Sequence, residues 1–257
     1  MILPDLRPLV AVTRDERADD ALTRALESKG ARALPLATIR IVPPADPAPL
    51  AAALERLPRY DWIVFTSAHA VEAACSHPAW TGEPPRARIA AVGAATARRL
   101  TAYGLRVDLV PPSAGGRELA DALKQAGSLA GARVLWPRSE IARPELAVEL
   151  ALEGAAIVDP PAYGTSAVVP ERLPEFLDAL ESRRLAAVAF LSPSSARGLA
   201  AALPGGTLRP LAGRTVVACI GPTTSAAVAE LGVRVDLEPP QRSAAALAAA
   251  IVRRVAA

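Results

Sequence analysis

Hydroxyl side chains recur at one kind of position along this chain of 257 residues: after a short apolar run and at the start of a predicted helix. A helix start presents backbone N–H groups that have no partner inside the helix, and a hydroxyl beside them can bind the same anion. Serine and threonine are also preferred helix caps, so capping alone is an equally good interpretation of any one of them. The candidate anion-binding residues at these helix starts are Thr66, Ser67, Thr96, Ser192, Ser194, Gly221 and Thr224.

Two arginines and a tyrosine extend this set. Arg14 and Arg138 stand at the ends of predicted strands, where they could add positive charge for carboxylates or phosphates, although a solvated arginine is at least as common there. Tyr163 lies in the proline- and glycine-containing segment 160–170, which we expect to be irregular and not a packed strand.

The elements that would position these residues occur twice. The most similar pair of segments shares ten identical residues at an offset of 128. Self-similarity at a nearly constant spacing is typical of duplicated structural units, so we expect one unit in two copies. The repeated pairs are 89–112 with 217–240, 61–71 with 187–196, and 10–30 with 134–154.

Each copy alternates predicted strands and helices, which indicates parallel sheets covered by helices on both faces. In such sheets ligands bind beyond the carboxyl ends of the strands, which is where the hydroxyl groups stand. We expect these edges to form a cleft for a ligand with many carboxylates or phosphates. Two irregular segments, near residues 40 and 163, are the candidates for crossings between two domains.

Composition argues against several classes of protein. No apolar run approaches the ~20 residues of a membrane span, and the N-terminus lacks the apolar core of a signal peptide, so we expect a cytoplasmic protein with no membrane contact. The net charge of +3 is small, and the arginines are scattered with few aromatic residues between them. This pattern argues against a nucleic-acid partner.

Familiar cofactor and nucleophile motifs are missing. The chain has no glycine-rich nucleotide motif after a strand, and no Ser–His–Asp set can be proposed. His69 and His77 lack partners at metal-ligand spacing, and we expect both at the surface. Cys75 and Cys219 are expected to be reduced thiols in the core. The chemistry should therefore need neither a metal nor a cofactor.

An ordered set of motifs spans nearly the whole chain, at Val12–Arg14, Phe65–Val71, Val92–Pro111, Val134–Arg143, Ala162–Thr165, Phe190–Ala196 and Ile220–Gly232. This set resembles the uroporphyrinogen-III synthase family. Each motif is weak alone, and the ordered set is specific. The sequence departs from the family pattern at His69, where asparagine is common, at Leu191, which replaces a threonine, and at Ser225, which replaces an alanine.

The resemblance implies a cofactor-free lyase that acts on hydroxymethylbilane, a linear tetrapyrrole with eight carboxylates. Loss of the terminal hydroxyl gives an azafulvene, which the substituted α-carbon of the last pyrrole attacks to form a spiro intermediate. Rearrangement inverts the last ring before closure to uroporphyrinogen III. Tyr163 could protonate the departing hydroxyl, and a purely positioning role for it is nearly as well supported.

The resemblance also implies the architecture: two similar flavodoxin-like parallel-sheet domains joined by a two-segment hinge. Residues 1–38 and 166–257 would form one domain, and residues 39–165 the inserted one. The expected protein is a monomer, which could interact with the enzyme that supplies the bilane. A different class stays open: a two-lobed ligand-binding or sensor protein without catalysis, which turnover of freshly generated bilane would distinguish from an enzyme.

Overall fold

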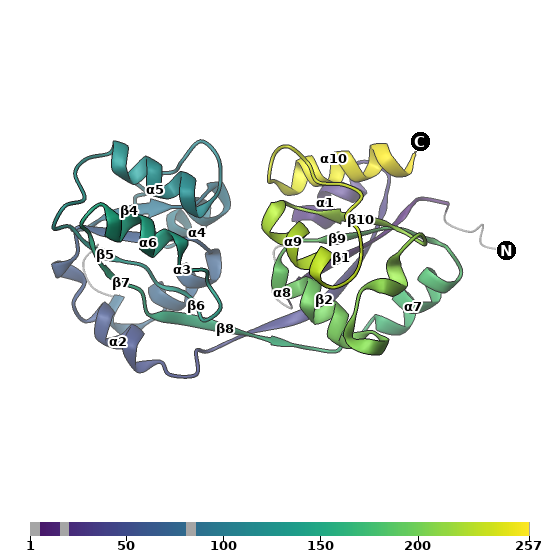
Figure 1. Ribbon diagram of the computed structural model, residues 1–257, viewed down its shortest axis with the longest axis horizontal. Helices are drawn as coiled ribbons and strands as arrows, with labels where there is room; N and C mark the ends of the chain where they lie inside the picture. Colours follow the sequence, from purple (N-terminus) through teal and green to yellow (C-terminus); the bar gives the residue numbers. More distant parts are fainter. Residues whose placement is uncertain (1–5, 16–20, 81–85, 257) are drawn as a thin grey trace. The chain divides into compact units, whose positions relative to one another are not determined.

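The computed structural model describes residues 6–15, 21–80 and 86–256. The chain divides into two compact units, which we call unit 1 (Met1–Arg40 and Ser166–Ala257) and unit 2 (Ile41–Thr165). The chain passes between the units within strands β2 (Arg32–Val42) and β8 (Pro161–Ala167), which neighbour each other in the strand order (Figure 1). The expectation of an irregular segment at 160–170 was therefore wrong, because most of it pairs as a strand.

Unit 1 is built on a parallel sheet in the order β10 (Val216–Cys219), β9 (Leu185–Phe190), β1 (Leu9–Asp15), β2. Leu237 adds a parallel bridge to Ala218 beyond β10. The strands are apolar on both faces because helices cover both. One face carries α1 (Ala21–Glu27) and α10 (Ala244–Val255). The other carries α7 (Leu173–Glu181), α8 (Pro193–Ala202) and α9 (Pro222–Glu230), with short 3-10 turns at Pro204–Gly206 and Arg209–Leu211.

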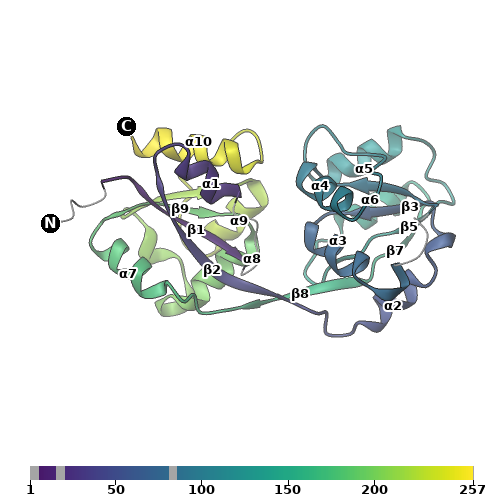
Figure 2. The ribbon, with the colours of Figure 1, turned by 180° about the vertical axis from the view of Figure 1, so that it is seen from behind.

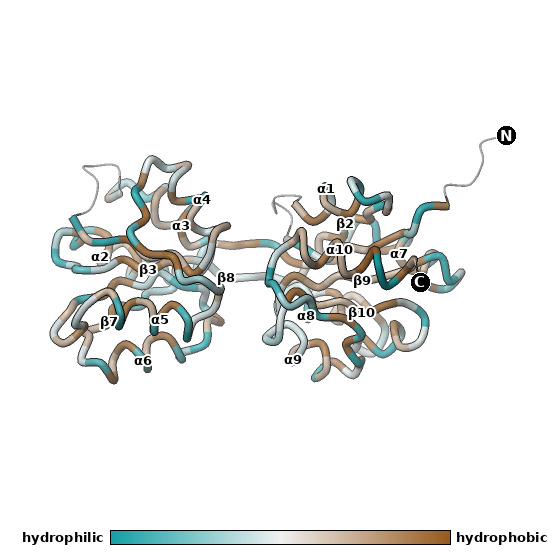
Figure 3. The backbone as a smooth tube through the Cα atoms, turned by 90° about the horizontal axis from the view of Figure 1, so that it is seen from above, coloured by the Kyte–Doolittle hydropathy of each residue, from teal (hydrophilic) through white to brown (hydrophobic). Residues whose placement is uncertain are grey.

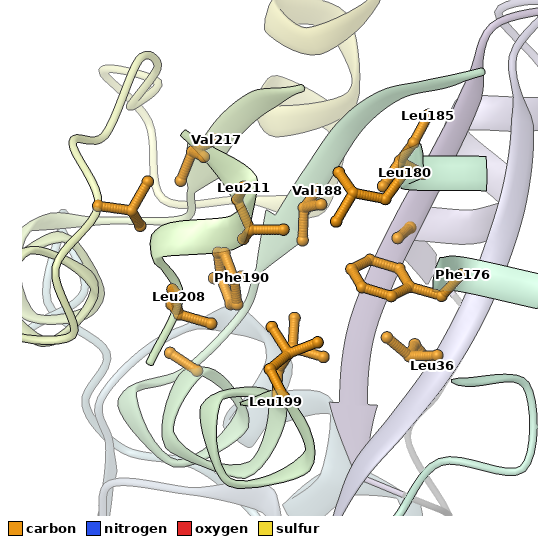
Figure 4. Packing of buried hydrophobic residues seen from close by; sticks show 14 of the residues in the cluster. Leu36, Phe176, Leu180, Leu185, Val188, Phe190, Leu199, Leu208, Leu211 and Val217 are labelled. Carbon is orange, nitrogen blue, oxygen red and sulfur yellow. The ribbon is translucent and has the colours of Figure 1, made fainter. Parts of the chain in front are cut away.

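Large apolar side chains pack between this second face of the unit 1 sheet and its helices. Phe176 of α7, Leu199 of α8 and Phe190 of β9 are fully buried and pack with Leu208 and Leu211 of the turns between α8 and β10 (Figure 4). Burial of such large apolar side chains is the main stabilising contribution to a fold of this kind.

Unit 2 repeats the plan with a parallel sheet in the order β4 (Arg88–Ala91), β3 (Trp62–Phe65), β5 (Arg133–Leu135), β7 (Ala156–Val158), and Leu109 bridges to Ala90. Helices α5 (Gly116–Gln125) and α6 (Glu145–Leu152) cover one face. Helices α2 (Ala48–Leu54), α3 (Ala68–Cys75) and α4 (Ala94–Ala102) cover the other, with 3-10 turns at Leu57–Arg59 and Pro78–Trp80 (Figure 2). Along α5 and α6 hydrophobic and hydrophilic residues alternate along the tube, as expected for helices with one buried face (Figure 3).

The sequence repeat corresponds to structurally equivalent strands. In unit 1, Arg14 pairs with Ala37, the register shifts, and Asp15 pairs with Ile39. In unit 2 the short strand β6 (Arg138–Ser139) shows the same irregularity 124 residues later: Arg138 pairs with Pro161, and Ser139 pairs with Tyr163. Both units thus have the strand order 2-1-3-4-5 of flavodoxin-like folds, when unit 2 is counted from β5.

The chain therefore has an α/β fold with two parallel sheets. No helix within the described ranges is long and apolar enough to cross a membrane. The sequence predicts a helix at 15–30, of which α1 covers Ala21–Glu27; Asp15 ends β1, and residues 16–20 lie outside the described ranges.

Candidate functional site

The carboxyl edge of the unit 2 sheet holds a hydrogen bond between neighbouring strands. Trp136 follows β5, and its indole Nε1 donates to the Thr66 hydroxyl, which follows β3, over 3.0 Å. Trp136 is only 3% exposed. These two strands flank the switch point of a flavodoxin-like sheet, where ligands bind in such folds. The predicted anion-binding hydroxyl of Thr66 is thus already the acceptor of a buried indole.

Ser67 and helix α3 continue this edge. Ser67 is extended and caps α3, with its hydroxyl accepting from Ala70 N over 3.0 Å. His69, the second residue of α3, meets the ring of Tyr163 edge to face, with centroids 5.5 Å apart and planes at 63°. His69 is half-buried, so its expected surface position was only partly right. Tyr163 is half-buried as well and packs on the core of unit 2.

The segment between β5 and α6 ties several groups to β8. Glu140 N donates to the carbonyl of Tyr163 over 3.0 Å, and the Glu140 carboxylate accepts from Ala45 N over 2.6 Å. Arg138 Nε donates to Asp159 Oδ2 over 2.7 Å, so an acidic partner already balances this predicted anion-binding arginine. Glu140 had no predicted role, although it lies in the matching segment Val134–Arg143.

The first turns of α4 and α9 are equivalent, and each carries a threonine after a glycine. Gly93 and Gly221 are the caps, both with extended backbone, while Thr96 and Thr224 occupy the third helical position. Both threonines are buried, at 4% and 3% exposure. Capping, the alternative interpretation of these threonines, is therefore wrong, because a glycine already holds the cap position.

Helix α8 in unit 1 begins with a reciprocal cap. The Ser192 hydroxyl accepts from Ser195 N over 3.1 Å, and the Ser195 hydroxyl accepts from Ser192 N over 3.2 Å. Ser195 is buried and also accepts at 3.1 Å from the Thr13 hydroxyl of β1. Ser195 belongs to the hydroxyl cluster 192–195 that the sequence indicates at this helix start, whereas Thr13 had no predicted role. Ser194, the second residue of α8, is half-buried.

The predicted residues fall into two sets. The edge of unit 2 carries Thr66, Ser67, Thr96, Arg138 and Tyr163, and the edge of unit 1 carries Arg14, Ser192, Ser194, Gly221 and Thr224. Arg14 is half-buried near the end of β1, and the side chain of Arg242 lies 3.3 Å from where a Cβ on Gly221 would be.

Neither cysteine is suited to nucleophilic chemistry. Cys75 and Cys219 are buried and form no disulfide, and burial raises the pKa of each thiol to about 12. Among the residues that the structure describes, no group of three or more histidine, cysteine, aspartate or glutamate side chains could hold a metal ion.

Comparisons with known proteins identify relatives over most of the chain. A family model described as uroporphyrinogen-III synthase HemD matches residues 20–249. The chain belongs to the uroporphyrinogen-III synthase family. It is 31% identical over 245 residues to the uroporphyrinogen-III synthase of Synechococcus elongatus, across 91% of this chain and 90% of that protein. It is 32% identical over 237 residues to the chloroplastic uroporphyrinogen-III synthase of Oryza sativa, across 88% of this chain and 74% of that protein.

Solved structures of the family share the fold. A mutant uroporphyrinogen III synthase from Thermus thermophilus superposes with a TM-score of 0.60 at 19% identity, across 97% of this chain and 98% of that one. The uroporphyrinogen-III synthetase from Helicobacter pylori gives a TM-score of 0.57 at 16% identity, across 92% and 94%. At these identities the likeness shows a common α/β fold.

Proposed function

We propose that this protein cyclises hydroxymethylbilane to uroporphyrinogen III, with inversion of the last ring and loss of water, as a lyase of tetrapyrrole biosynthesis. Membership of the family over residues 20–249 carries this proposal. The two equivalent sheet edges support it, because each gathers helix starts and hydroxyl groups suited to carboxylates.

Backbone amides are the main candidates for holding the carboxylates of the substrate. The first N–H groups of a helix have no partner within it, and each serine cap uses only one of them. In α3 the Ser67 hydroxyl accepts from one of these amides, Ala70 N. The helix dipole adds favourable potential for negative charge at the same place.

In our proposal Tyr163 donates its phenolic proton to the terminal hydroxyl of the bilane. The C–O bond breaks, water leaves, and the azafulvene that forms is attacked by the substituted α-carbon of the last pyrrole. After the spiro intermediate rearranges, the final ring closure releases a proton from a pyrrole carbon, and this proton restores the phenol. The protein also holds the chain so that the inverting path outruns spontaneous closure to the type I isomer.

The decisive experiment is turnover of freshly generated bilane followed by isomer analysis. An enzyme gives type III product, whereas a binding or sensor protein leaves the type I product of spontaneous closure unchanged.

Tyr163→Phe keeps the ring and removes the phenolic proton. We expect it to lower the rate of type III formation by ~100-fold, since positioned acid catalysis contributes about that much. An unchanged rate in the folded variant would leave conformational control by the protein as the mechanism.

We also infer that units 1 and 2 are two domains, with boundaries near residues 38 and 165, joined by a two-segment hinge. We infer a cytoplasmic monomer that receives its bilane from the enzyme that makes it. The two buried, unpaired thiols support a reducing compartment. Light scattering on the purified protein tests the monomer, whose expected mass is 26.6 kDa.

A further inference from the structure

His69 and Tyr163 form an aromatic pair at the carboxyl edge of the unit 2 sheet. Their ring centroids are 5.5 Å apart, and their planes meet at 63°. Aromatic rings favour such edge-to-face contacts at separations of about 4.5–7 Å. The contact limits the rotation of the Tyr163 ring, because the imidazole occupies space on one side of it.

The backbones of both residues are fixed, so the contact has a defined geometry. His69 is the second residue of α3, and the Ser67 cap anchors that turn through Ala70 N. The carbonyl of Tyr163 accepts from Glu140 N, and its side chain packs on the core of unit 2. Because the turn that carries His69 and the strand that carries Tyr163 are both held by hydrogen bonds, the contact between the two rings is well suited to position a reacting group.

The equivalent positions of unit 1 show that the fold does not need this pair. The register shift shared by the two units makes Ile39 the equivalent of Tyr163, since Asp15 pairs with Ile39 as Ser139 pairs with Tyr163. Helix α8 holds Ser194 at its second position, where α3 holds His69. The same backbone therefore carries an aliphatic residue and a small one in unit 1, and two aromatic rings in unit 2.

We propose that His69 is a positioning residue for the reaction: its imidazole holds the Tyr163 ring so that the phenol points at the departing hydroxyl. This inference rests on the proposed function.

Steady-state kinetics on three variants test the role. His69→Ala removes the ring, and we expect kcat for type III formation to fall about tenfold with KM within about twofold, because misplaced reacting groups lose rate more than binding. His69→Phe restores an aromatic ring and should recover most of kcat. In a Tyr163→Phe background, His69→Ala should cost less than about twofold, because the hydroxyl that His69 positions is gone.

The control is His77→Asn, which removes the only other histidine of the chain and keeps an acceptor for Ala79 N. It should leave kcat unchanged. The proposal is overturned by an unchanged kcat in His69→Ala, by a rise in KM alone, or by an equal loss with and without the Tyr163 hydroxyl.

A measurement without substrate separates this inference from the proposed function. With only two histidines in the chain, protein labelled with 15N-histidine gives two sets of imidazole signals, and His69→Phe identifies which set belongs to His69. Tyr163→Leu removes the ring current and should shift the His69 signals while those of His77 stay in place. Unmoved His69 signals would overturn the pairing even if His69→Ala failed to fold. Absence of type III product from the unaltered protein, with the His69 signals shifted, would overturn the proposed function instead.

Discussion

Thr66→Val tests whether the Thr66 hydroxyl supports the fold. Valine keeps the shape of threonine and removes the acceptor that lies 3.0 Å from Trp136 Nε1. The indole is 3% exposed, so its N–H would lose its partner inside the protein. A buried donor without a partner costs about 1–3 kcal/mol. The free energy of unfolding falls by about 1–3 kcal/mol per M of urea, so the urea concentration at the unfolding midpoint of unit 2 should fall by about 1 M.

Tryptophan fluorescence reports this unfolding selectively, because all three tryptophans of the chain, Trp62, Trp80 and Trp136, lie in unit 2. In a Trp136→Phe background Thr66→Val should cost less than ~0.5 kcal/mol, since both polar partners are then absent. Thr101→Val makes the same chemical change at an exposed position of unit 2 and should move the midpoint little. An unchanged midpoint in Thr66→Val, or an equal cost in the Trp136→Phe background, would refute the reasoning.

Three further predictions follow from local geometry. Gly198→Ala should destabilise unit 1 by about 3 kcal/mol or more in thermal unfolding followed by circular dichroism, because the new Cβ would lie 2.2 Å from Thr38 O; Gly116→Ala, whose Cβ would meet Leu146 at 3.9 Å, should be tolerated. Ser67→Ala should lower the free energy of unfolding in urea by ~1 kcal/mol, because α3 loses its cap. It should slow type III formation by less than about tenfold, because the backbone amides of α3 persist. Complete loss of activity in the folded variant would contradict carboxylate binding by these amides. Cys75 and Cys219 should react with a thiol reagent at pH 8 only after unfolding, because pKa values of about 12 keep both thiols protonated in the native protein. Rapid labelling of the native protein would contradict this prediction and show that the thiols are accessible.

Much of the fold could be predicted because its signals are local. The expected alternation of strands and helices is confirmed, for example where β3 is followed by α3. The repeat also predicted which strands are equivalent, because glycine turns and apolar runs recur at a constant spacing. Strand β8 was missed because its proline and glycine argue for a turn. That segment pairs nonetheless, since Pro161 opens the strand, where a missing N–H costs little.

The candidate site was harder to predict, because its contacts join residues far apart in the chain. No spacing rule brings Trp136 to Thr66, or Glu140 to Ala45. The helix starts at Thr96 and Thr224 were found correctly, and only the structure shows that both threonines lie in the first turn and are not the caps.

The duplication itself shows where the two units differ. They share strand order, register shift and glycine-capped helices, so these features belong to the common fold. At the carboxyl edge of unit 2, Thr66, His69 and Tyr163 replace Leu191, Ser194 and Ile39 of unit 1. Three substitutions at one edge place a hydroxyl, an imidazole and a phenol where unit 1 has two aliphatic side chains and one small hydroxyl. Proton transfer needs such groups, whereas carboxylate binding needs only the helix starts that both units keep.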